Sequence, residues 1–537
     1  MDFEENNLEI ESSVDNQDNI GSDLKNNDNY FDNDDIKDDF LFDIPELSRT
    51  ILYFGSSLED KQWMCEKVKY DFDMNYMAPM IALKEPFKFM SSKFIESNEA
   101  LNNYLDNFIF ELKNFCQEDN SESDTDLISL IKDIADEDSL TTRFKTKTVV
   151  ETLYAGRIRY GTTNGRLNPQ IIQLEGPFSL NRGEIISLDL SLLKNSLNEN
   201  GEFNYSLFPG KIVILKGQNF TGNYISVTKF IDYSKFIMPD FPLKCPPVLL
   251  DQHSFNIICA SGPFVRFDPQ SNAKYDPTDT SCVLAIADYL KRYNPDVLLL
   301  FGPFFDESQL DAIQKWSLQD TLSDNSYPYQ WSLERLVHNQ IRALMVAIEG
   351  RSIHTKIVII PSSNELGQVN VYPMFPLENK FSTEYPTVKS YSNPSLLNIG
   401  GIAVGVTSTD ILLHLSRKEI HNIDSTNSKI QSERLKRLCE QIILHRHFYP
   451  LLPPDPSINM EYPLYHHLSM VVTPHILIIP SVLRPFAYNI NGTIIINPGK
   501  MIKNTFARIM FEPLKNEKNY CGSLYQYTNV EIIKLKP

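Results

Sequence analysis

The sequence predicts a chain of several parts, in which a small all-β barrel is followed by a layered α/β domain. Its 537 residues exceed what a single hydrophobic core usually organises. Short β-rich segments follow residue 147, and from about residue 246 buried strand-like runs alternate with helical patterns. We therefore divide the chain into an acidic region (1–80), a helix with an acidic linker (81–146), a barrel (147–245) and an α/β domain (246–537).

The first fifty residues hold sixteen acidic and three basic residues, so most of the net charge of −19 lies there. Residues 1–45 are polar and poor in aromatic residues, and such a segment cannot bury enough apolar surface to offset its chain entropy. We predict a disordered tail that is either a solvated extension or an electrostatic interaction arm. Because DNA binding normally rests on Lys and Arg contacts with phosphates, the charge balance argues against tight autonomous DNA binding.

An amphipathic helix is predicted after Pro86, a residue suited to a first helical turn. Apolar residues recur in steps of four and three along one face of this helix, at Leu101, Leu105, Phe108, Leu112 and Phe115. We expect this face to pack on the body of the same chain. The acidic stretch from Gln117 to Asp138 then links the helix to the barrel.

The barrel prediction rests on five short β-rich segments within about 85 residues, with a hairpin-turn signal at Thr163-Asn-Gly165. The segments are Val149–Ile158, Ile171–Leu174, Ile185–Leu190, Lys211–Leu215 and Tyr224–Val227. This number and spacing suit a five-stranded Greek-key barrel such as an OB-fold, although other small barrels would give a similar pattern.

The α/β domain is predicted from apolar runs of the kind found in buried central strands. These runs are Phe255–Ala260, Val297–Phe301, Lys356–Ile360, Ile402–Val406 and Ile476–Ile479. Helical patterns at Ser332–Ala347 and Arg434–Leu444 lie between them. The polar stretch from Ser416 to Gln431 is predicted to be a surface insertion.

The remaining residues of chemical interest favour structural roles. Seven dispersed cysteines without a CxxC pair are typical of buried, reduced thiols rather than disulfides or a zinc module. His253, His354, His445, His447, His466, His467 and His475 are expected on the surface or in the hydrogen-bonded core. We find no GxSxG, GxxxxGK[ST] or HExxH motif, no membrane-sized apolar run and no signal-peptide pattern, so we expect a soluble intracellular protein without a cofactor.

Functional loops of an α/β sheet lie at the carboxyl ends of its strands. Here these loops are Ser261–Phe264, Gly302–Asp306, Pro361–Glu365, Pro480–Leu483 and Gly492–Gly499. Their order resembles that of the calcineurin-like metallophosphoesterases, whose loops run Asp-x-His, Gly-Asp-x-x-Asp, Gly-Asn-His-Asp/Glu and Gly-His-Thr-His before a final Asn-Pro-Gly. In that family the side chains hold two metals that activate water.

Aligned with this family, the chain lacks most of the ligands. Residues that are poor metal ligands stand at the ligand positions, namely Ser261, Pro263, Pro303, Ser363, Asn364, Ser481 and Leu483. Asp306, Glu365 and the Asn497-Pro-Gly499 turn remain, which is too few for a two-metal site. The resemblance therefore implies vestigial loops with no catalytic residue and no bound metal.

A small barrel followed by such a ligand-depleted domain resembles the B-subunit family of replicative DNA polymerases. Several segments are similar to its alpha branch: Phe89–Glu111, Ala155–Ile158, Gly405–His414, Phe448–Pro450, Ser481–Phe486, Asn497–Lys500 and Thr505–Arg508. The resemblance covers residues 85–537. Residues 1–80 depart from it, because alpha-branch subunits commonly begin with a helical domain.

The resemblance implies a nuclear, non-catalytic accessory subunit that acts in RNA–DNA primer synthesis at the initiation of replication. Its partner would be the zinc-binding C-terminal region of the polymerase alpha catalytic subunit and, through it, primase. DNA contact would be indirect or weak.

Three alternatives stay open. One is the equivalent subunit of polymerase delta or epsilon, and another is an active metal-dependent phosphodiesterase or nuclease. The third is a single-strand-binding barrel that uses basic and aromatic residues. Its candidates are Arg157, Arg159, Arg166, Lys211, Lys216, Tyr154, Tyr160 and Phe220.

Overall fold

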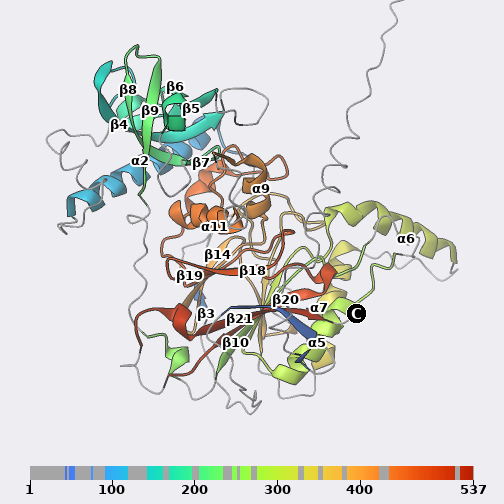
Figure 1. Cartoon of the computed structure of the whole chain (residues 1–537). Helices are drawn as coiled ribbons and strands as arrows, with labels where there is room; N and C mark the ends of the chain where they lie inside the picture. The colour runs from blue at the N-terminus through green and yellow to red at the C-terminus, as the bar shows by residue number, and fades with distance from the viewer. Residues whose placement is uncertain are drawn as a thin grey trace, which may run out of the picture.

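The structure is a computed structural model, and its described residues form a barrel beside a larger two-sheet body (Figure 1). The described residues are 43–44, 48–54, 74–76, 91–118, 142–160, 167, 170–195, 205–233, 245–250, 254–267, 275–323, 332–348, 355–377, 384–422, 434–514 and 520–535. The tail over 1–42, the Thr163–Gly165 turn, Pro86, Arg166, His253 and His354 lie outside them.

Five strands close the barrel in the order β4-β5-β6-β9-β8, as predicted. Their bounds are β4 (Thr148–Tyr160), β5 (Ile172–Glu175), β6 (Ile185–Asp189), β8 (Ile212–Asn219) and β9 (Tyr224–Ile231). Alternate residues of β5 and β6, such as Ile172 and Leu174 opposite Leu188 and Ile186, fill the interior. This period of two is what a half-buried strand requires. The short helix α4 (Phe178–Asn181), η2 (Ser191–Asn195) and β7 (Tyr205–Leu207) complete this part.

The body contains an eight-stranded sheet in the order β1-β2-β21-β20-β10-β11-β12-β13. A six-stranded sheet runs β18-β19-β17-β15-β14-β3. All five predicted central strands are present: β10 (Phe255–Ser261), β11 (Val297–Phe301), β12 (Lys356–Ile360), β15 (Ile402–Val406) and β17 (Ile476–Ile478). The others are β13 (Val388–Ser390), β14 (Ser395–Ile399), β18 (Phe486–Ile490), β19 (Thr493–Asn497), β20 (Thr505–Phe511) and β21 (Thr528–Leu535).

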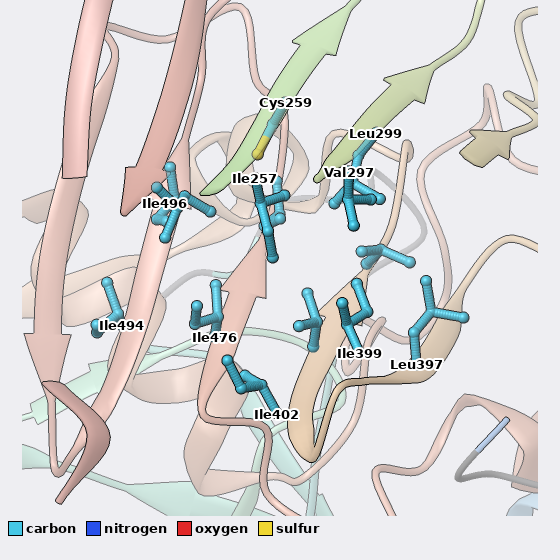
Figure 2. Close-up of a cluster of buried hydrophobic side chains, with 14 of the residues drawn as sticks. Ile257, Cys259, Val297, Leu299, Leu397, Ile399, Ile402, Ile476, Ile494 and Ile496 are labelled. Carbon is cyan, nitrogen blue, oxygen red and sulfur yellow. The ribbon is translucent and has the colours of Figure 1, made fainter. Parts of the chain in front are cut away.

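The main core lies between the two sheets, where side chains from both meet (Figure 2). In β10, Ile257 and Cys259 point into this core, whereas Ile258 and Ala260 join a second core on the opposite face. A strand buried on both faces needs apolar residues at consecutive positions. This explains why the central strands have continuous apolar sequences.

Helices cover the outer face of each sheet. On the eight-stranded sheet these are α5 (Ser281–Tyr293), α6 (Leu310–Ser323) and α7 (Leu333–Ile348). On the six-stranded sheet they are α9 (Ile411–Lys418) and α11 (Arg434–Leu444), which lie between the sheet and the barrel (Figure 1). The helices predicted over Ser332–Ala347 and Arg434–Leu444 are confirmed to within one residue.

The acidic N-terminal region (1–80) contributes three strands that the sequence did not predict, and the first of them, at Asp43–Ile44, corrects the end of the tail predicted to be disordered over 1–45. Strands β1 (Asp43–Ile44) and β2 (Ser48–Phe54) extend the eight-stranded sheet, and β3 (Met74–Tyr76) is an edge of the other sheet. Strand β2 pairs with β21, and β3 pairs with β14. These partners are distant in sequence, so local composition gave no sign of the pairing.

Helix α2 (Phe94–Glu118) packs against the barrel and the body, as the apolar stripe predicted. Leu105, Phe108 and Leu112 are buried, and they form one cluster with residues of β4 and β8. On the body side, the Tyr104 hydroxyl donates a hydrogen bond to the carbonyl of His445 at 3.0 Å. The helix therefore contacts both parts of the molecule.

A second correction concerns the surface insertion predicted over Ser416–Gln431. The first residues of this stretch belong to the C-terminal end of α9. The residues that follow form β16 (Ile420–Asn422), which pairs with β7 beside the barrel. Between them Glu419 is buried and accepts a hydrogen bond from the Ser206 hydroxyl at 2.6 Å and from the Arg437 guanidinium at 2.7 Å. These residues therefore join the barrel part to the body. Residues 423–431 lie outside the described part of the chain.

Candidate functional site

The loops at the carboxyl ends of the sheet strands surround a cavity of about 230 Å³. Five of the predicted site residues line it: Pro263, Pro303, Asp306, Ser363 and Asn364. They come from the loops after β10, β11 and β12, which are neighbouring parallel strands and so end at one edge of the sheet. The loops also touch closely, because a Cβ atom at Gly262 would lie 1.8 Å from the Pro303 carbonyl oxygen.

Glu365 is buried and bonds to the neighbouring loop. Its carboxylate accepts hydrogen bonds from the backbone N–H groups of Phe304 at 2.7 Å and Phe305 at 3.1 Å. Burial raises the pKa of Glu365 to about 8, and the nearby charge of Asp306 acts in the same direction. The residue therefore holds the β11 loop in place.

Asp306 forms the N-cap of the short helix η4 (Glu307–Gln309). Its Oδ1 atom accepts hydrogen bonds from the backbone N–H of Ser308 at 3.0 Å and from the Ser308 hydroxyl at 2.6 Å. The Gln309 side chain completes a capping box with the Asp306 backbone at 3.2 Å. One carboxylate oxygen is thereby committed to the loop itself.

Asn497 is fully buried, and both the oxygen and the nitrogen of its side-chain amide form hydrogen bonds with backbone groups. Its Oδ1 atom accepts hydrogen bonds from the N–H groups of Ser481 at 2.9 Å and Gly499 at 3.0 Å. Its Nδ2 atom donates to the carbonyls of Leu483 at 3.1 Å and Arg484 at 3.0 Å. The amide therefore shapes two loops, and its oxygen already accepts two hydrogen bonds.

The other predicted positions do not line the cavity. Ser481 is buried beside Asn497, and Leu483 packs against the core near α9 and α11. Ser261 is also buried, and its hydroxyl accepts a hydrogen bond from the Nζ atom of Lys500 at 3.1 Å. Lys500, named in the sequence only within the Asn497–Lys500 resemblance, lines the cavity.

Sequence reasoning did not single out the side chains that the β15–α9 segment places in the cavity, Asp410 and His414 among them. Asp410 caps α9 by accepting from the Leu413 N–H at 3.0 Å, and its second oxygen accepts from the Val482 N–H at 2.9 Å. The Nδ1 atom of His414 lies 2.9 Å from the Tyr449 hydroxyl. Its pKa is lowered, mainly by burial. An N-cap signal, an acidic residue just before a helical pattern, could have identified Asp410.

These donors do not fit a two-metal site. Within the described ranges, no group of three or more His, Cys, Asp or Glu residues is placed to hold a metal ion. The carboxylates of Glu365 and Asp410 bond to backbone N–H groups through both oxygens, and that of Asp306 through one. No catalytic step is therefore assigned to a metal ion at this cavity.

Several histidines and cysteines have core environments, as predicted. His445 accepts a hydrogen bond from the Ile212 N–H at 3.1 Å, and burial lowers its pKa to about 3. His447 and His475 are also buried. Cys245, Cys259, Cys282 and Cys439 are buried free thiols, as predicted, whereas Cys521 is exposed, so the prediction of burial is wrong for that residue.

The barrel residues considered for nucleic-acid binding do not form one exposed surface. Tyr154 is buried, and Arg157 is buried in an ion pair with Glu175 at 2.9 Å. Lys211 donates a hydrogen bond to the Ser206 carbonyl at 2.7 Å, and burial lowers its pKa to about 8. Among the described candidates Phe220 and Arg159 are about half exposed, and Arg159 lies 3.7 Å from the Glu175 carboxylate. A basic groove with stacking aromatics is therefore not evident on the described barrel.

Fold and site together define a class of protein: an OB-type barrel joined to a two-sheet α/β body whose loop side chains bond mainly to backbone. Two family models match the same two parts. Residues 257–488 match the model of the B subunits of DNA polymerases alpha and epsilon, and residues 122–233 match that of the OB domain of the DNA polymerase alpha B subunit. The chain is therefore similar, over both of these parts, to the B subunits of DNA polymerases alpha and epsilon.

Curated relatives carry the alpha-branch name. The chain is 32% identical to the B subunit of DNA polymerase alpha from Mus musculus, over 65% of this chain and 52% of that protein. It is 29% identical to the corresponding B subunit of Schizosaccharomyces pombe, over 71% and 64% of the two chains. The chain thus spans about half the length of the mammalian relatives it matches.

Similarity to solved structures is much weaker. Vacuolar protein sorting 29 from Cryptosporidium parvum is 10% identical, covers 53% of this chain and 99% of its own, and has a TM-score of 0.20. A Thermus thermophilus protein, TT1561, is 10% identical over 47% of this chain and 93% of its own, with a TM-score of 0.22. Within the described residues, no helix is both long and apolar enough to cross a membrane.

Proposed function

We propose that this protein is the non-catalytic accessory subunit of the DNA polymerase alpha–primase complex. It would hold the zinc-binding C-terminal region of the catalytic subunit and, through that region, primase. The alpha-branch names of the curated relatives and the match to the alpha OB domain support this choice over the delta and epsilon branches. Its place of action would be the nucleus.

The observation that carries the non-catalytic part of the proposal is the use of the loop side chains. Glu365, Asn497 and Asp410 bond to the backbone of a neighbouring loop, where a hydrolase would direct side chains at metal and substrate. Such bonds keep loops rigid. A rigid surface suits a scaffold, because a preorganised interface loses little entropy on binding.

We propose the division of the chain that its sequence predicts: an acidic region over 1–80, a helix and linker over 81–146, an OB domain over 147–245 and an α/β domain over 246–537. The α/β domain would be a calcineurin-like phosphoesterase domain that has lost activity. Ser261, Pro263, Pro303, Asp306, Ser363, Asn364, Ser481 and Leu483 would be its vestigial loop positions. The order of the substituted loops along the chain supports this kinship.

Co-purification tests the partner. The full chain, carrying an affinity tag and expressed at its native level, is expected to recover the polymerase alpha catalytic subunit and both primase subunits in equal amounts. Recovery of a delta or epsilon catalytic subunit without primase would contradict the proposal. Deletion of the C-terminal zinc-binding region from the catalytic subunit should abolish recovery of both partners.

A nuclease and phosphodiesterase assay with added Mn²⁺ tests the absence of catalysis. The purified chain and its Asp306→Ala variant are expected to give the same background rate. A rate that exceeds background and disappears in the variant would show that the cavity is catalytic. The non-catalytic proposal would then fail, even if the partners were correct.

A further inference from the structure

We propose that the acidic segment formed by residues 1–15 of this chain docks on an exposed apolar and basic surface at one end of the barrel. We call this surface the barrel-end patch, and it consists of Arg143, Lys145, Lys147, Val149, Val150 and Phe220. The contact joins two parts of the same chain. It goes beyond the accessory role proposed above, and neither proposal depends on the other.

The centre of the barrel-end patch is apolar. Val149 and Val150 on β4 are each 74% exposed, and Phe220 in the turn after β8 is 49% exposed. Thr148 pairs with Asn219 in the ladder between β4 and β8, and Asn219 is fully buried. Because side chains alternate along a strand, Val149 and Phe220 lie on the outward face of this ladder. Exposed apolar side chains that gather inside a polar rim are typical of an interaction site.

The basic rim lies directly beside this centre. A Cβ atom at Gly222, in the turn between β8 and β9, would be 3.7 Å from the Lys145 carbonyl oxygen and 3.9 Å from the Lys147 side chain. The Asn219 side-chain amide holds the same turn to this segment by donating a hydrogen bond to the Phe144 carbonyl at 2.6 Å. The rim and the apolar centre therefore form one continuous surface.

The charge of this end of the barrel is positive. Segments 143–151 and 216–229 contain one acidic residue, Glu151, and five basic ones, which are Arg143, Lys145, Lys147, Lys216 and Lys229. In the part of the chain that the structure describes, Arg143 and Lys147 form no ion pair, and both are exposed. These two side chains are able to attract an acidic ligand.

Three acidic side chains near the barrel-end patch oppose such a ligand. Glu151 lies 3.2 Å from Lys216, and Glu184 forms an ion pair with Lys145. Asp189 lies across β9 from the end of β8, and its carboxylate accepts a backbone hydrogen bond at 3.0 Å. With all three counted, the five basic residues still exceed the acidic ones by two.

Residues 1–15 complement the barrel-end patch in charge and in apolar content. They contain six acidic residues and no Lys or Arg, and their apolar side chains include Phe3, Leu8, Ile10 and Val14. Residues 16–42 are less suitable because they include Lys25 and Lys37, but they form a spacer of 27 residues before β1. A spacer of this length reaches up to roughly 90 Å. A compact chain of this size is about 60 Å across, so the segment can reach the barrel.

The apolar centre favours a peptide over nucleic acid. Single-stranded nucleic acid binds through bases that stack on aromatic side chains, in addition to its basic contacts. Within the barrel-end patch Phe220 is the aromatic residue, whereas Val149 and Val150 offer no flat surface for stacking. The two valines can instead bury apolar side chains such as Leu8 and Ile10. An acidic peptide with interspersed apolar residues is therefore the better match.

Fluorescence anisotropy with the full chain tests the contact, using a labelled peptide of residues 1–15 as the probe. The first recipient is a full-length neutral variant, whose own segment has lost its charge and does not compete. Its substitutions are Asp2→Asn, Glu4→Gln, Glu5→Gln, Glu9→Gln, Glu11→Gln and Asp15→Asn. We expect saturable binding to the neutral variant. Binding to the wild type should be at least about fivefold weaker, because its own segment occupies the barrel-end patch at a high effective concentration.

Substitutions in the barrel-end patch, made in the neutral variant, locate the contact. Lys145→Glu with Lys147→Glu should weaken peptide binding about tenfold or more, because two attractive charges become repulsive. Val149→Ser with Val150→Ser should also weaken it, since the apolar centre is lost while every charge is kept. The matched controls are Lys389→Glu on β13 and Val346→Ser on α7, both at exposed positions of the body, and neither should change the affinity.

The proposal is overturned if the peptide does not bind saturably, if the wild type binds it as tightly as the neutral variant, or if both double variants bind it as tightly as their controls. Labelled oligothymidine is measured in parallel. Tighter binding of oligothymidine than of the peptide, lost in Lys145→Glu with Lys147→Glu, would assign the surface to nucleic acid and overturn the proposal. Analytical ultracentrifugation of the wild type should show a monomer, and a dimer that the peptide dissociates would assign the contact to a second copy instead. None of these outcomes alters the result expected from co-purification.

Discussion

The carboxylate of Glu365 accepts a hydrogen bond from the backbone N–H of Phe304 at 2.7 Å, so a side chain after β12 fixes the loop after β11. Burial removes this carboxylate from water and disfavours its charged form, so its pKa rises from 4.5 to about 8. The loop geometry is therefore coupled to the protonation of one buried acid.

This coupling predicts a pH-dependent stability. Because the folded-state pKa of Glu365 is raised, its contribution is fully present below pH 4.5 and is lost as the pH rises through about 8. Glu365→Gln removes the ionisation, so its free energy of unfolding relative to wild type should increase across that window. Each unit of pKa difference corresponds to about 1.4 kcal/mol. Urea unfolding at several pH values measures this, and a constant difference between the two proteins would contradict it. Glu307→Gln, at an exposed neighbouring site, serves as the control.

Asn497→Ala should destabilise the protein by about 2 kcal/mol or more. The change leaves the buried N–H of Ser481 and the N–H of Gly499 without their acceptor, and an unsatisfied buried polar group costs about 1–3 kcal/mol. Denaturant unfolding measures the loss. Asn364→Ala is the matched control at an exposed position and should stay within about 0.5 kcal/mol of wild type. Equal effects of the two substitutions would refute the structural role assigned to Asn497.

The joint between barrel and body can be tested at Glu419 and Arg437, which form a buried ion pair at 2.7 Å. Glu419→Met removes the carboxylate that faces the buried guanidinium of Arg437 and should cost about 3–5 kcal/mol. The double variant Glu419→Met with Arg437→Met should recover much of that loss, because the buried guanidinium is removed together with its carboxylate, whereas Arg434, 3.7 Å from Glu419, is half exposed to water. A double-mutant cycle of unfolding free energies gives the coupling. Additive single effects would show that the pair does not act as a unit.

Helix α2 offers a comparison of its two faces. Leu112 is fully buried against the barrel, whereas Phe110 is 61% exposed. Leu112→Ala should cost about 2–5 kcal/mol, the range for a buried leucine. Phe110→Ala should cost much less, although it removes a larger side chain. A larger loss for Phe110→Ala, measured by thermal unfolding, would mean that the helix packs by its other face.

The central strands and the helices α7 and α11 were predictable because their apolar periods are local. The meeting of Pro263, Pro303 and Asn364 at one edge followed from the rule that parallel strands end together. Strands β1, β2 and β3 were not predictable, because the partners of β2 and β3 lie hundreds of residues away and the sequences of all three lack a long apolar run.

The roles of individual polar residues were also hidden in the sequence. In the alignment with the metallophosphoesterases, Asp306 and Glu365 were two of the positions at which a metal ligand remained. In the structure both side chains accept hydrogen bonds from loop backbone. Glu419 lay in a stretch predicted to be a polar insertion, and its buried partners Ser206 and Arg437 come from separate segments. A polar residue's partner depends on three-dimensional neighbours, which a residue pattern in one chain does not encode.

The position of β21 between β2 and β20 has a consequence for biosynthesis. Strand β2 leaves the ribosome among the first described residues, but the strand it pairs with is translated among the last. At about 5–20 residues per second, β2 therefore waits on the order of half a minute or longer before its pairing edge exists. During translation β2 can pair with β1 on one side, but its edge toward β21 stays open, and the large sheet is completed only when β21 has emerged.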